Sequence, residues 1–299
     1  MKKINKKILV TGGAGFIGSN LIEQLVKDPS NEVYSLDNYS TGSKKNHISG
    51  ATYIEGDTCD IAKLVSVKPD LIFHLGEYAR VEKSFEDMPL VWHSNKDGTF
   101  AVLEFARARK SKLVYAGSST KFGLSAPHGG AQAGDGGLGR DQSPYAWTKA
   151  SNTELVKNYG LWFGLPYAVT YFYNVYGPRE ISRGGFATVI GIFKEKIKSG
   201  KPLPVVSPGT QTRIFTHVDD IVRGLVLVGE KGAGDDYGLG AEEEYSILDI
   251  AKLFGGEIMM LPSRAGNRMN STIDLSRSRD ELGWQAQKSI RKYIEEFLR

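Results

Sequence analysis

A glycine-rich segment near the start of the chain constrains its fold more than any other feature. The apolar run 7–11 leads directly into this segment, in which Gly12, Gly15 and Gly18 recur at three-residue spacing before a predicted helix. Without side chains, such positions let the backbone approach a pyrophosphate at the N-terminus of a helix. The segment therefore predicts a strand, a tight turn and a helix that together bind a dinucleotide.

Short apolar runs alternate with helical patterns through the first half of the chain, which predicts a doubly wound parallel sheet of the α/β class. After about residue 175, prolines and glycines divide the chain into shorter elements. We therefore expect a dinucleotide-binding domain over 1–174 and a smaller α/β substrate domain over 175–299, from which the helix 218–228 packs back onto the sheet. The predicted strands cover residues 7–11, 32–36, 52–55, 71–75, 113–116 and 167–172.

The composition excludes several classes of protein. A chain of 299 residues with 40% hydrophobic and 24% charged residues can form a large domain and a smaller one. Its single cysteine, Cys59, excludes an internal disulfide and suits a reducing cytoplasm, and no CxxC or HExxH spacing suggests a metal. A net charge of +4 without a long basic cluster favours a small anionic ligand over a nucleic acid. We expect neither a signal peptide nor a membrane-spanning helix.

Acidic residues follow two of the predicted strands. Asp37 ends the second strand, where a carboxylate can accept hydrogen bonds from the adenosine ribose hydroxyls and would repel a 2′-phosphate, so we expect NAD rather than NADP. Capping of the turn at 38–42 is the alternative role, and Lys44 and Lys45 leave room for NADP. Asp57 ends the third strand and could contact the adenine or cap a helix.

Tyr145 and Lys149 are the candidate catalytic pair. Four residues apart, they share one face of a predicted helix, and the ammonium would favour the ionised phenol, whose ordinary pKa is near 10. Tyr145 could then act as a base near neutral pH. Alone, the spacing also fits an amphipathic surface helix. Together with the glycine-rich segment, it indicates redox chemistry on a bound dinucleotide.

The stretch before this helix, 124–139, consists almost entirely of glycine, alanine and small polar residues. It has no periodicity, so it predicts an irregular loop. Such a loop could be a lid or an inserted surface segment.

Further motifs cover essentially the whole length in one order. They are TGGAGFIG at 11–18, Asp37-Asn38, Gly56-Asp57, His74-Leu75-Gly76, Asn95 with Gly98-Thr99, Ser118-Ser119, Tyr145 with Lys149, NVYGPR at 174–179 and RIFTHVDD at 213–220. This set resembles the extended short-chain dehydrogenase/reductases, specifically the NAD-dependent nucleotide-sugar epimerases and dehydratases of the UDP-glucose 4-epimerase-like type. The resemblance implies a Rossmann-type domain, tightly held NAD, a C-terminal domain that binds a nucleoside-diphosphate sugar, and a homodimer joined through a helical bundle that includes the Tyr145/Lys149 helix.

The resemblance also implies roles for individual residues. Tyr145 would take the proton of the sugar 4-hydroxyl, Lys149 would hold the cofactor ribose and favour the phenolate, and Ser118 would share the hydroxyl proton. Asn174, Arg179, Arg213 and Arg264 would contact the substrate, with the last two on its diphosphate. His217 fits a packing or capping residue better than a catalyst. The residues expected at the cofactor are Gly12, Gly15, Phe16, Ile17, Gly18, Asp37, Asn38, Ser40, Thr41, Gly42, Asp57, Thr58, Leu75, Gly76, Asn95, Tyr145, Lys149 and Tyr171.

The reaction itself depends on residues near the 4-keto sugar. The Asp-Glu pair usual in 4,6-dehydratases is replaced here by Ser119 and Thr120, which favours a C4 epimerase. Shifting the alignment by one residue brings Lys121 into the pair, where it could act as an acid. Lys121 and Glu77 together make a 4,6-dehydratase the main alternative.

A charged pair, Glu77 and Arg80, stands where the family commonly has small residues, and either enters the nicotinamide site or forms an ion pair at a loop. A C4 oxidase, a ketosugar reductase and a non-catalytic NAD sensor complete the alternatives. The residues at 205–209 do not specify the base or the sugar. Surface-polysaccharide synthesis is the setting that the resemblance suggests.

Overall fold

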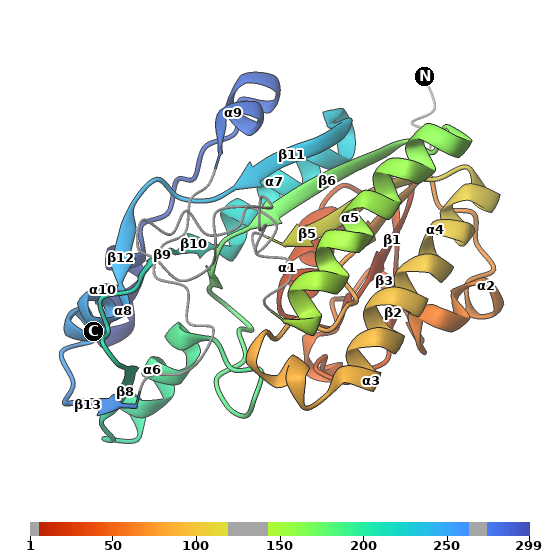
Figure 1. The fold of residues 1–299 in the computed structure, drawn as a ribbon. Coiled ribbons are helices and arrows are strands. Elements are labelled where there is room, and N and C mark those ends of the chain that lie inside the picture. The colour runs from red at the N-terminus through yellow and green to blue at the C-terminus, as the bar shows by residue number, and fades with distance from the viewer. Residues whose placement is uncertain (1–5, 119–142, 263–273) are drawn as a thin grey trace, which may run out of the picture.

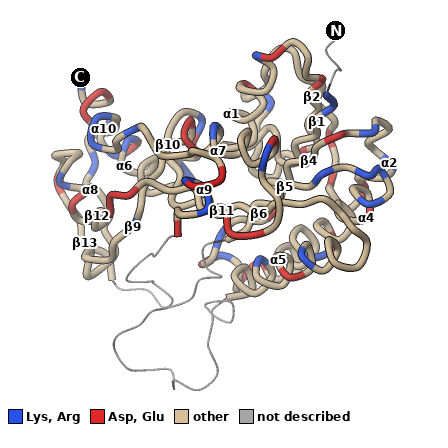
Figure 2. Tube along the Cα trace, turned by 90° about the horizontal axis from the view of Figure 1, so that it is seen from above, with Lys and Arg blue, Asp and Glu red and all other residues tan. Residues whose placement is uncertain are grey.

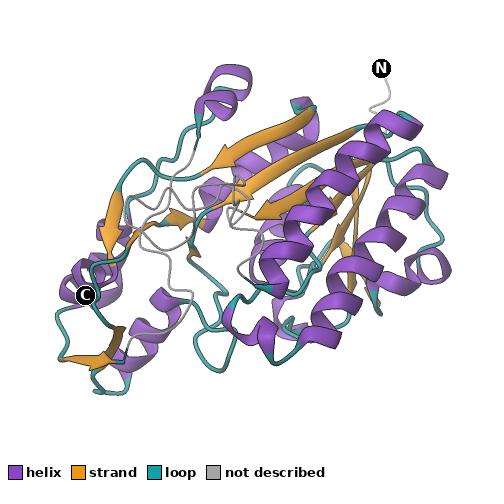
Figure 3. Ribbon diagram, viewed as in Figure 1, coloured by secondary structure: helices purple, strands orange, loops and turns teal. Residues whose placement is uncertain are grey.

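A seven-stranded parallel sheet forms the centre of the computed structural model, which describes residues 6–118, 143–262 and 274–299 (Figures 1 and 3). The strands lie in the order β11-β6-β5-β4-β1-β2-β3, and each neighbouring pair is parallel. The predicted doubly wound α/β fold is thereby confirmed. The strands are β1 (Lys6–Thr11), β2 (Asn31–Asp37), β3 (Ala51–Glu55), β4 (Leu71–His74), β5 (Lys112–Ser118), β6 (Tyr167–Phe172) and β11 (Gly234–Leu239).

The strand order reverses between β1 and β4. The chain runs outward from β1 to β2 and β3, then returns to β4 on the other side of β1. In open parallel sheets, ligands bind at such a point, beyond the carboxyl ends of the strands. Thr11 and His74 end the two strands there, so the residues that follow them border the expected crevice.

Helices cover both faces of the sheet. On one face, α1 (Phe16–Leu25) and α7 (Val218–Lys231) pack on Ile8 and Val10, while on the other α4 (Gly98–Arg109) and α5 (Pro144–Phe163) lie side by side over Leu9 (Figure 1). Because both faces are buried, the strand reads as a continuous apolar run rather than an alternating one. The predicted packing of the helix 218–228 on the sheet is confirmed by α7.

A third hydrophobic cluster belongs wholly to the second half of the chain, from Tyr176 to Phe297. It lies between α6, α8, α10 and the β8–β13 pair. From the same half, however, β11 is a strand of the central sheet and α7 packs on that sheet. The domain boundary at 174/175 therefore stays a prediction. The elements of this half are β7 (Val175–Tyr176), α6 (Val189–Lys198), β8 (Leu203–Val206), β9 (Thr212–Ile214), β10 (Thr216–His217), β12 (Glu244–Ser246), α8 (Ile247–Phe254), β13 (Ile258–Leu261), α9 (Ser276–Leu282) and α10 (Ile290–Leu298).

The first half also contains short helical turns: η1 (Lys44–Asn46), η2 (Thr58–Asp60), α2 (Ile61–Leu64), η3 (Glu82–Phe85), α3 (Met88–Val91) and η4 (Trp92–Asp97). Basic and acidic residues are interspersed over the described elements (Figure 2). Among the described helices, none combines the length and the apolar character needed to cross a membrane.

Candidate active site

The glycine-rich segment forms a tight turn between β1 and α1. Gly12 has φ of +72°, and a Cβ there would lie 2.9 Å from the Gly76 Cα, so the turn packs against the residues that follow β4. A Cβ on Gly18 would collide with the Gly12 carbonyl oxygen. At Gly15, which caps α1, an added Cβ would meet only that oxygen, at 3.2 Å. The turn therefore presents bare backbone at a helix N-terminus, which fits a dinucleotide pyrophosphate.

Asp37 is buried at the end of β2 and is bound to this turn. Its Oδ2 accepts from the Ala14 N–H at 2.8 Å, and its Oδ1 accepts from the Tyr39 N–H at 2.8 Å. A Cβ on Gly42 would lie 2.8 Å from Oδ1, so the following loop also passes close by. Asp37 thus caps the turn that follows β2, which is the alternative role given above. Recognition of the ribose by the remaining lone pairs of its carboxylate stays a prediction.

Asp57 caps η2 after β3. Its Oδ1 accepts from the Cys59 N–H at 2.9 Å, and its Oδ2 accepts from Asn38 Nδ2 at 3.0 Å. An adenine contact by Asp57 stays a prediction. The side chains of Asp57, Cys59 and His93 also lie close together, with the atoms that could bind a metal ion within 4.8 Å of one another. Burial and the Asp57 carboxylate raise the pKa of the Cys59 thiol to about 12.

Tyr145 and Lys149 lie four residues apart in the first turns of α5, and Lys149 faces the sheet. The helix begins where the Ser143 side chain accepts from the Ala146 N–H at 3.1 Å and Pro144 occupies the first helical position. Lys149 Nζ donates to the Ala116 carbonyl of β5 and to the Glu77 carboxylate, and it lies 4.4 Å from the centre of the Tyr115 ring. Ser118 ends β5, the strand that contacts this ammonium.

Glu77, three residues after β4, is the unexpected member of the site. Its side chain is 4% exposed and that of Lys149 is 5% exposed, so the two form a buried ion pair. The second oxygen, Oε1, accepts from Thr99 Oγ1 at 2.8 Å, Asn152 Nδ2 at 3.0 Å and the Tyr115 hydroxyl at 3.1 Å. Burial by itself would raise the pKa of Glu77, but the ammonium outweighs burial and the pKa lies below its ordinary value.

A chain of hydrogen bonds connects this ion pair to the glycine turn. Thr11 Oγ1 accepts from the Leu75 and Gly76 N–H groups and lies 2.7 Å from His74 Nδ1, so its proton is directed at that nitrogen. His74 Nε2 then donates to Thr99 Oγ1 at 3.0 Å, and Thr99 donates to Glu77. Burial lowers the pKa of His74 to about 4, so the ring is neutral near pH 7. The smaller effects of the Glu77 carboxylate, which raises this pKa, and of the Lys149 ammonium, which lowers it, oppose each other.

The sequence left open an ion pair between Glu77 and Arg80, and the structure corrects this. Glu77 pairs with Lys149, while Arg80 donates from Nη2 to the Phe186 carbonyl and is held partly buried beside the aromatic pair Tyr78 and Phe186. The difference arises because α5 brings Lys149 across the sheet to the end of β4, a contact between residues 72 positions apart.

Three expected contact residues have structural roles here. Asn95 is fully buried and bridges the Tyr78 backbone to Thr148, and Tyr171 is fully buried with its hydroxyl on Asp235 at 2.6 Å. Both side chains therefore stabilise the scaffold here, and a cofactor contact by either one stays a prediction. Arg179 binds α1 through Asn20 and Glu23, both at 2.9 Å. Its guanidinium therefore docks the second half of the chain onto the first, and a substrate contact by Arg179 stays a prediction.

The remaining candidates divide between described and undescribed segments. Asn174 Nδ2 donates to the Ile214 carbonyl at 3.0 Å, and Arg213, on β9, donates to the Thr212 carbonyl at 2.7 Å. His217 caps α7 by accepting from the Asp219 N–H at 3.1 Å, as predicted. Ser119, Thr120, Lys121, the loop 124–139 and Arg264 lie outside the described residues.

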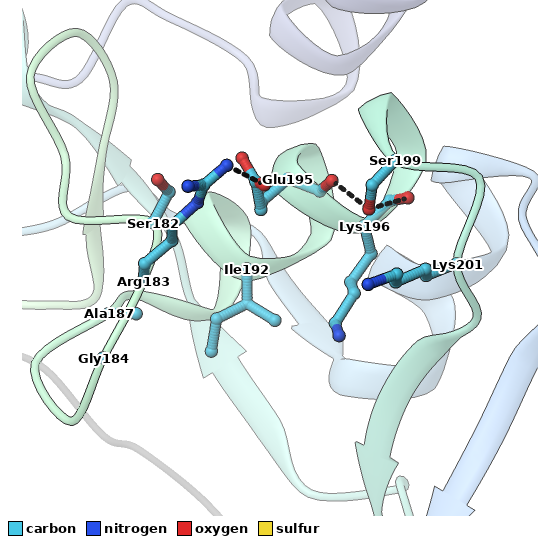
Figure 4. Close-up of a pocket in the computed structure, with 9 residues that line it drawn as sticks. All are labelled: Ser182, Arg183, Gly184, Ala187, Ile192, Glu195, Lys196, Ser199 and Lys201. Atoms are coloured by element: carbon cyan, nitrogen blue, oxygen red, sulfur yellow. Dashed lines mark hydrogen bonds and ion pairs between the residues drawn. The ribbon is translucent and has the colours of Figure 1, made fainter.

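A cavity of about 580 Å³ lies elsewhere, between the 182–187 loop and α6 (Figure 4). Its charged lining includes Arg183, Glu195 and Lys196, with Arg183 and Glu195 paired to each other. It contains neither Tyr145 nor any residue of the glycine turn. This cavity is therefore separate from the candidate active site at the glycine turn and Lys149.

The profile of the NAD dependent epimerase/dehydratase family matches residues 8–240. The chain belongs to this family. Its member from Mycolicibacterium smegmatis, named UDP-glucose 4-epimerase, is 31% identical over 96% of both chains. The UDP-N-acetyl-alpha-D-glucosaminuronate decarboxylase of Bacillus cytotoxicus is 33% identical over 83% of this chain and 79% of its own.

A solved structure has nearly the same fold. The dTDP-glucose 4,6-dehydratase of Streptomyces venezuelae, solved with NAD bound, superposes with a TM-score of 0.86 at 25% identity and covers 98% of this chain and 95% of its own. The protein described here is thus an NAD-dependent enzyme of the epimerase/dehydratase family, and its glycine turn and Asp37 fit that cofactor. Because the named relatives epimerise, dehydrate and decarboxylate their substrates, family membership does not select one reaction.

Proposed function

We propose that this enzyme is a nucleotide-sugar C4 epimerase that acts through a transient 4-keto sugar. The observation that supports epimerisation over dehydration is the engagement of Glu77. A 4,6-dehydratase needs a base for the C5 proton, and Glu77 is the carboxylate on which the dehydratase alternative partly rested. Both of its oxygens are occupied by donors of the protein, and its side chain is buried. Glu77 is therefore a poor candidate for a base that must reach the sugar.

The proposed chemistry needs few groups. When bound, NAD supplies the acceptor and then the donor of one hydride at C4. Tyr145 takes the proton of the 4-hydroxyl as the C4–H bond breaks, with Ser118 hydrogen-bonded to the same oxygen. After the keto sugar has turned in its pocket, Tyr145 returns the proton to the 4-oxygen. Hydride and proton are both restored, so the product is an isomer of the substrate.

Substrate binding is proposed for the edge between the sheet and the second half of the chain. Asn174, which directly precedes β7, and Arg213 on β9 both lie in this part of the fold. Together with Arg264 they would contact the diphosphate, for which a guanidinium is well suited. The 1–174 and 175–299 regions then act as the cofactor and substrate domains.

A homodimer is also proposed, through α4 and α5. These two adjacent helices, with the preceding turn η4, carry apolar side chains that are exposed in the single chain, and the rings of Trp92 and Trp147 stack with centres 5.8 Å apart. Large exposed apolar groups on one surface indicate an interface. The exposed residues are Trp92, Phe100, Trp147, Leu161, Trp162 and Phe163. A cytoplasmic place in surface-polysaccharide synthesis completes the proposal.

The test is mass spectrometry of products formed from UDP, GDP and dTDP hexoses, N-acetylhexosamines and uronic acids in deuterated water. A product of unchanged elemental composition, altered retention time and no carbon-bound deuterium supports epimerisation with returned hydride. Loss of one water with deuterium incorporation would make the enzyme a 4,6-dehydratase and direct attention to Lys121. Loss of carbon dioxide would make it a decarboxylase, and net NADH formation an oxidase.

A further inference from the structure

The ammonium of Lys149 faces the protein rather than open solvent. Two of its contacts are oxygens, the Glu77 carboxylate and the Ala116 carbonyl, and the Tyr115 ring lies beneath it. The carboxylate is itself fixed by Thr99, Tyr115 and Asn152, which come from two helices and a strand. A lysine held in this way has one defined position and an anion in direct contact with it.

We propose that Glu77 is a positioning residue that fixes Lys149 in place. Its charge also cancels much of the positive charge that Lys149 places beside Tyr145. This inference rests on the proposed role of Tyr145 as the base. Glu77 acts through Lys149 and touches neither sugar nor cofactor. Its hydroxyl and amide partners keep it charged and oriented, which is why a carboxylate can be buried at this point.

The electrostatic consequence follows from the pairing. A single ammonium a few ångströms from a phenol favours the phenolate by roughly 1–3 pH units. When a carboxylate touches that ammonium, the phenol experiences the small field of a dipole instead of a full charge. The proposed reaction requires the phenol both to take up a proton and to return it, so the charge beside the phenol bears on both steps.

Other charged or titratable groups face the pair, and none duplicates Glu77. His74 lies behind it with its pKa lowered to about 4, so the ring is neutral near pH 7. Lys96, from η4, donates to Ser151 at 3.0 Å and to Asn152 at 2.8 Å. Arg80, close enough to Tyr145 for an electrostatic effect, donates to Phe186. Lys96 and Arg80 add positive charge and His74 is neutral. Among the described groups around the pair, Glu77 is therefore the anion that opposes the charge of Lys149.

The first test compares the pH dependence of kcat/KM in NAD-loaded wild type, Glu77→Gln and Glu77→Asp. Glu77→Gln removes the charge and preserves the shape, so the acid limb should move about 1 pH unit or more to lower pH. Glu77→Asp keeps the charge and should leave the limb at the wild-type position. An acid limb that stays in place or rises in Glu77→Gln would overturn the proposal.

The second test uses the charge-neutral double variant Glu77→Gln/Lys149→Met, which keeps the proposal testable even if Glu77→Gln does not fold. Ultraviolet difference titration against the same protein carrying Tyr145→Phe reports the ionisation of Tyr145 without turnover. If the two charges cancel in the wild type, removing both should shift that ionisation by less than about 0.5 pH unit. A rise of about 1 unit or more would mean that Lys149 acts on the tyrosine unopposed, and Glu77 would lose its assigned role.

These readouts separate the two proposals. A wild-type protein that converts no nucleotide sugar in the substrate panel contradicts the proposed function. The titration of Tyr145 would still decide the role of Glu77, because it needs only folded, NAD-loaded protein. Conversely, epimerisation with an unmoved acid limb in folded Glu77→Gln would preserve the function and reject the inference.

Discussion

The carboxylate of Asp37 accepts the Ala14 N–H at 2.8 Å, so the end of β2 and the glycine turn form one unit. Replacing Asp37 with Ala removes this bond, the bond to Tyr39 and the charge that repels a 2′-phosphate. We expect the Kd of NAD to rise at least about tenfold and the preference for NAD over NADP to fall. Calorimetric titration with both cofactors measures the ratio. Glu32→Gln, at the half-buried start of the same strand, is the control. An unchanged preference in Asp37→Ala would contradict ribose recognition.

Tyr145→Phe tests the proton transfer. The variant keeps the ring in α5 and removes the hydroxyl, so turnover should fall by about 10²–10⁴-fold while the Kd of NAD stays near the wild-type value. Product formation and cofactor binding are measured on the same preparation. Lys157→Gln, farther along the same helix, changes a partly exposed ammonium that pairs with Glu154 and Asp235, and it should retain activity. Retained turnover in Tyr145→Phe would remove the tyrosine from the mechanism.

The strands of the central sheet were largely predictable because burial on both faces leaves uninterrupted apolar runs, as at Leu71–His74. The edge strand β11 escaped prediction. Its sequence, Gly-Asp-Asp-Tyr-Gly-Leu, contains residues with poor strand propensity, and its pairing with β6 determines its conformation. Tertiary contact therefore outweighed local preference at that edge.

The site was predictable where function depends on local spacing, and less so where it depends on distant contacts. The glycine turn and the Tyr145/Lys149 helix are continuous motifs. The pairing of Glu77 with Lys149 joins residues 72 positions apart, and no periodicity relates them. One signal was available in the sequence, a carboxylate three residues after the buried strand β4, but its partner could be found only from the path of α5. Arg179 shows the same limit, since its partners on α1 are set by docking of the two halves.

Stability should reveal the cost of separating the buried ion pair. Lys149→Met leaves the Glu77 carboxylate without its cation, which we expect to lower the free energy of unfolding by about 3–5 kcal/mol. Adding Glu77→Gln should recover much of that loss because a neutral amide replaces the stranded charge. Urea denaturation of wild type, both single variants and the double variant measures the coupling. Additive effects would show that the two side chains do not interact.

The proposed dimer predicts a change of mass. Leu161→Asp places a charge on the exposed apolar surface of α5, so the protein should elute as a monomer, with light scattering giving half the wild-type mass. Met259→Asp, at an exposed apolar position on β13, is the matched control and should leave the mass unchanged. A wild-type protein that is already monomeric at micromolar concentration would contradict the interface.

His74 predicts how stability depends on pH. Burial lowers the pKa of His74 to about 4, below its unfolded value near 6.5. Between these two values, the unfolded chain is protonated at His74 and the folded protein is not. The resulting stability is present above about pH 6.5 and is lost as the pH falls toward 4. Between pH 7 and pH 5 the loss from this residue should be about 2 kcal/mol. Glu77 contributes little in that window, because its pKa is lowered from 4.5 and the unfolded carboxyl is still mostly ionised at pH 5.

His74→Gln isolates this effect. The glutamine can hydrogen-bond to Thr11 and Thr99 but does not titrate, so the variant should be less stable than wild type at pH 7 yet lose less stability on acidification. Urea denaturation at pH 7 and pH 5 gives the four free energies required. The wild-type loss also contains the contribution of His217, whose pKa is likewise lowered by burial, but that contribution is common to both proteins and cancels in the comparison. Equal losses in the two proteins would show that His74 does not titrate differently on folding.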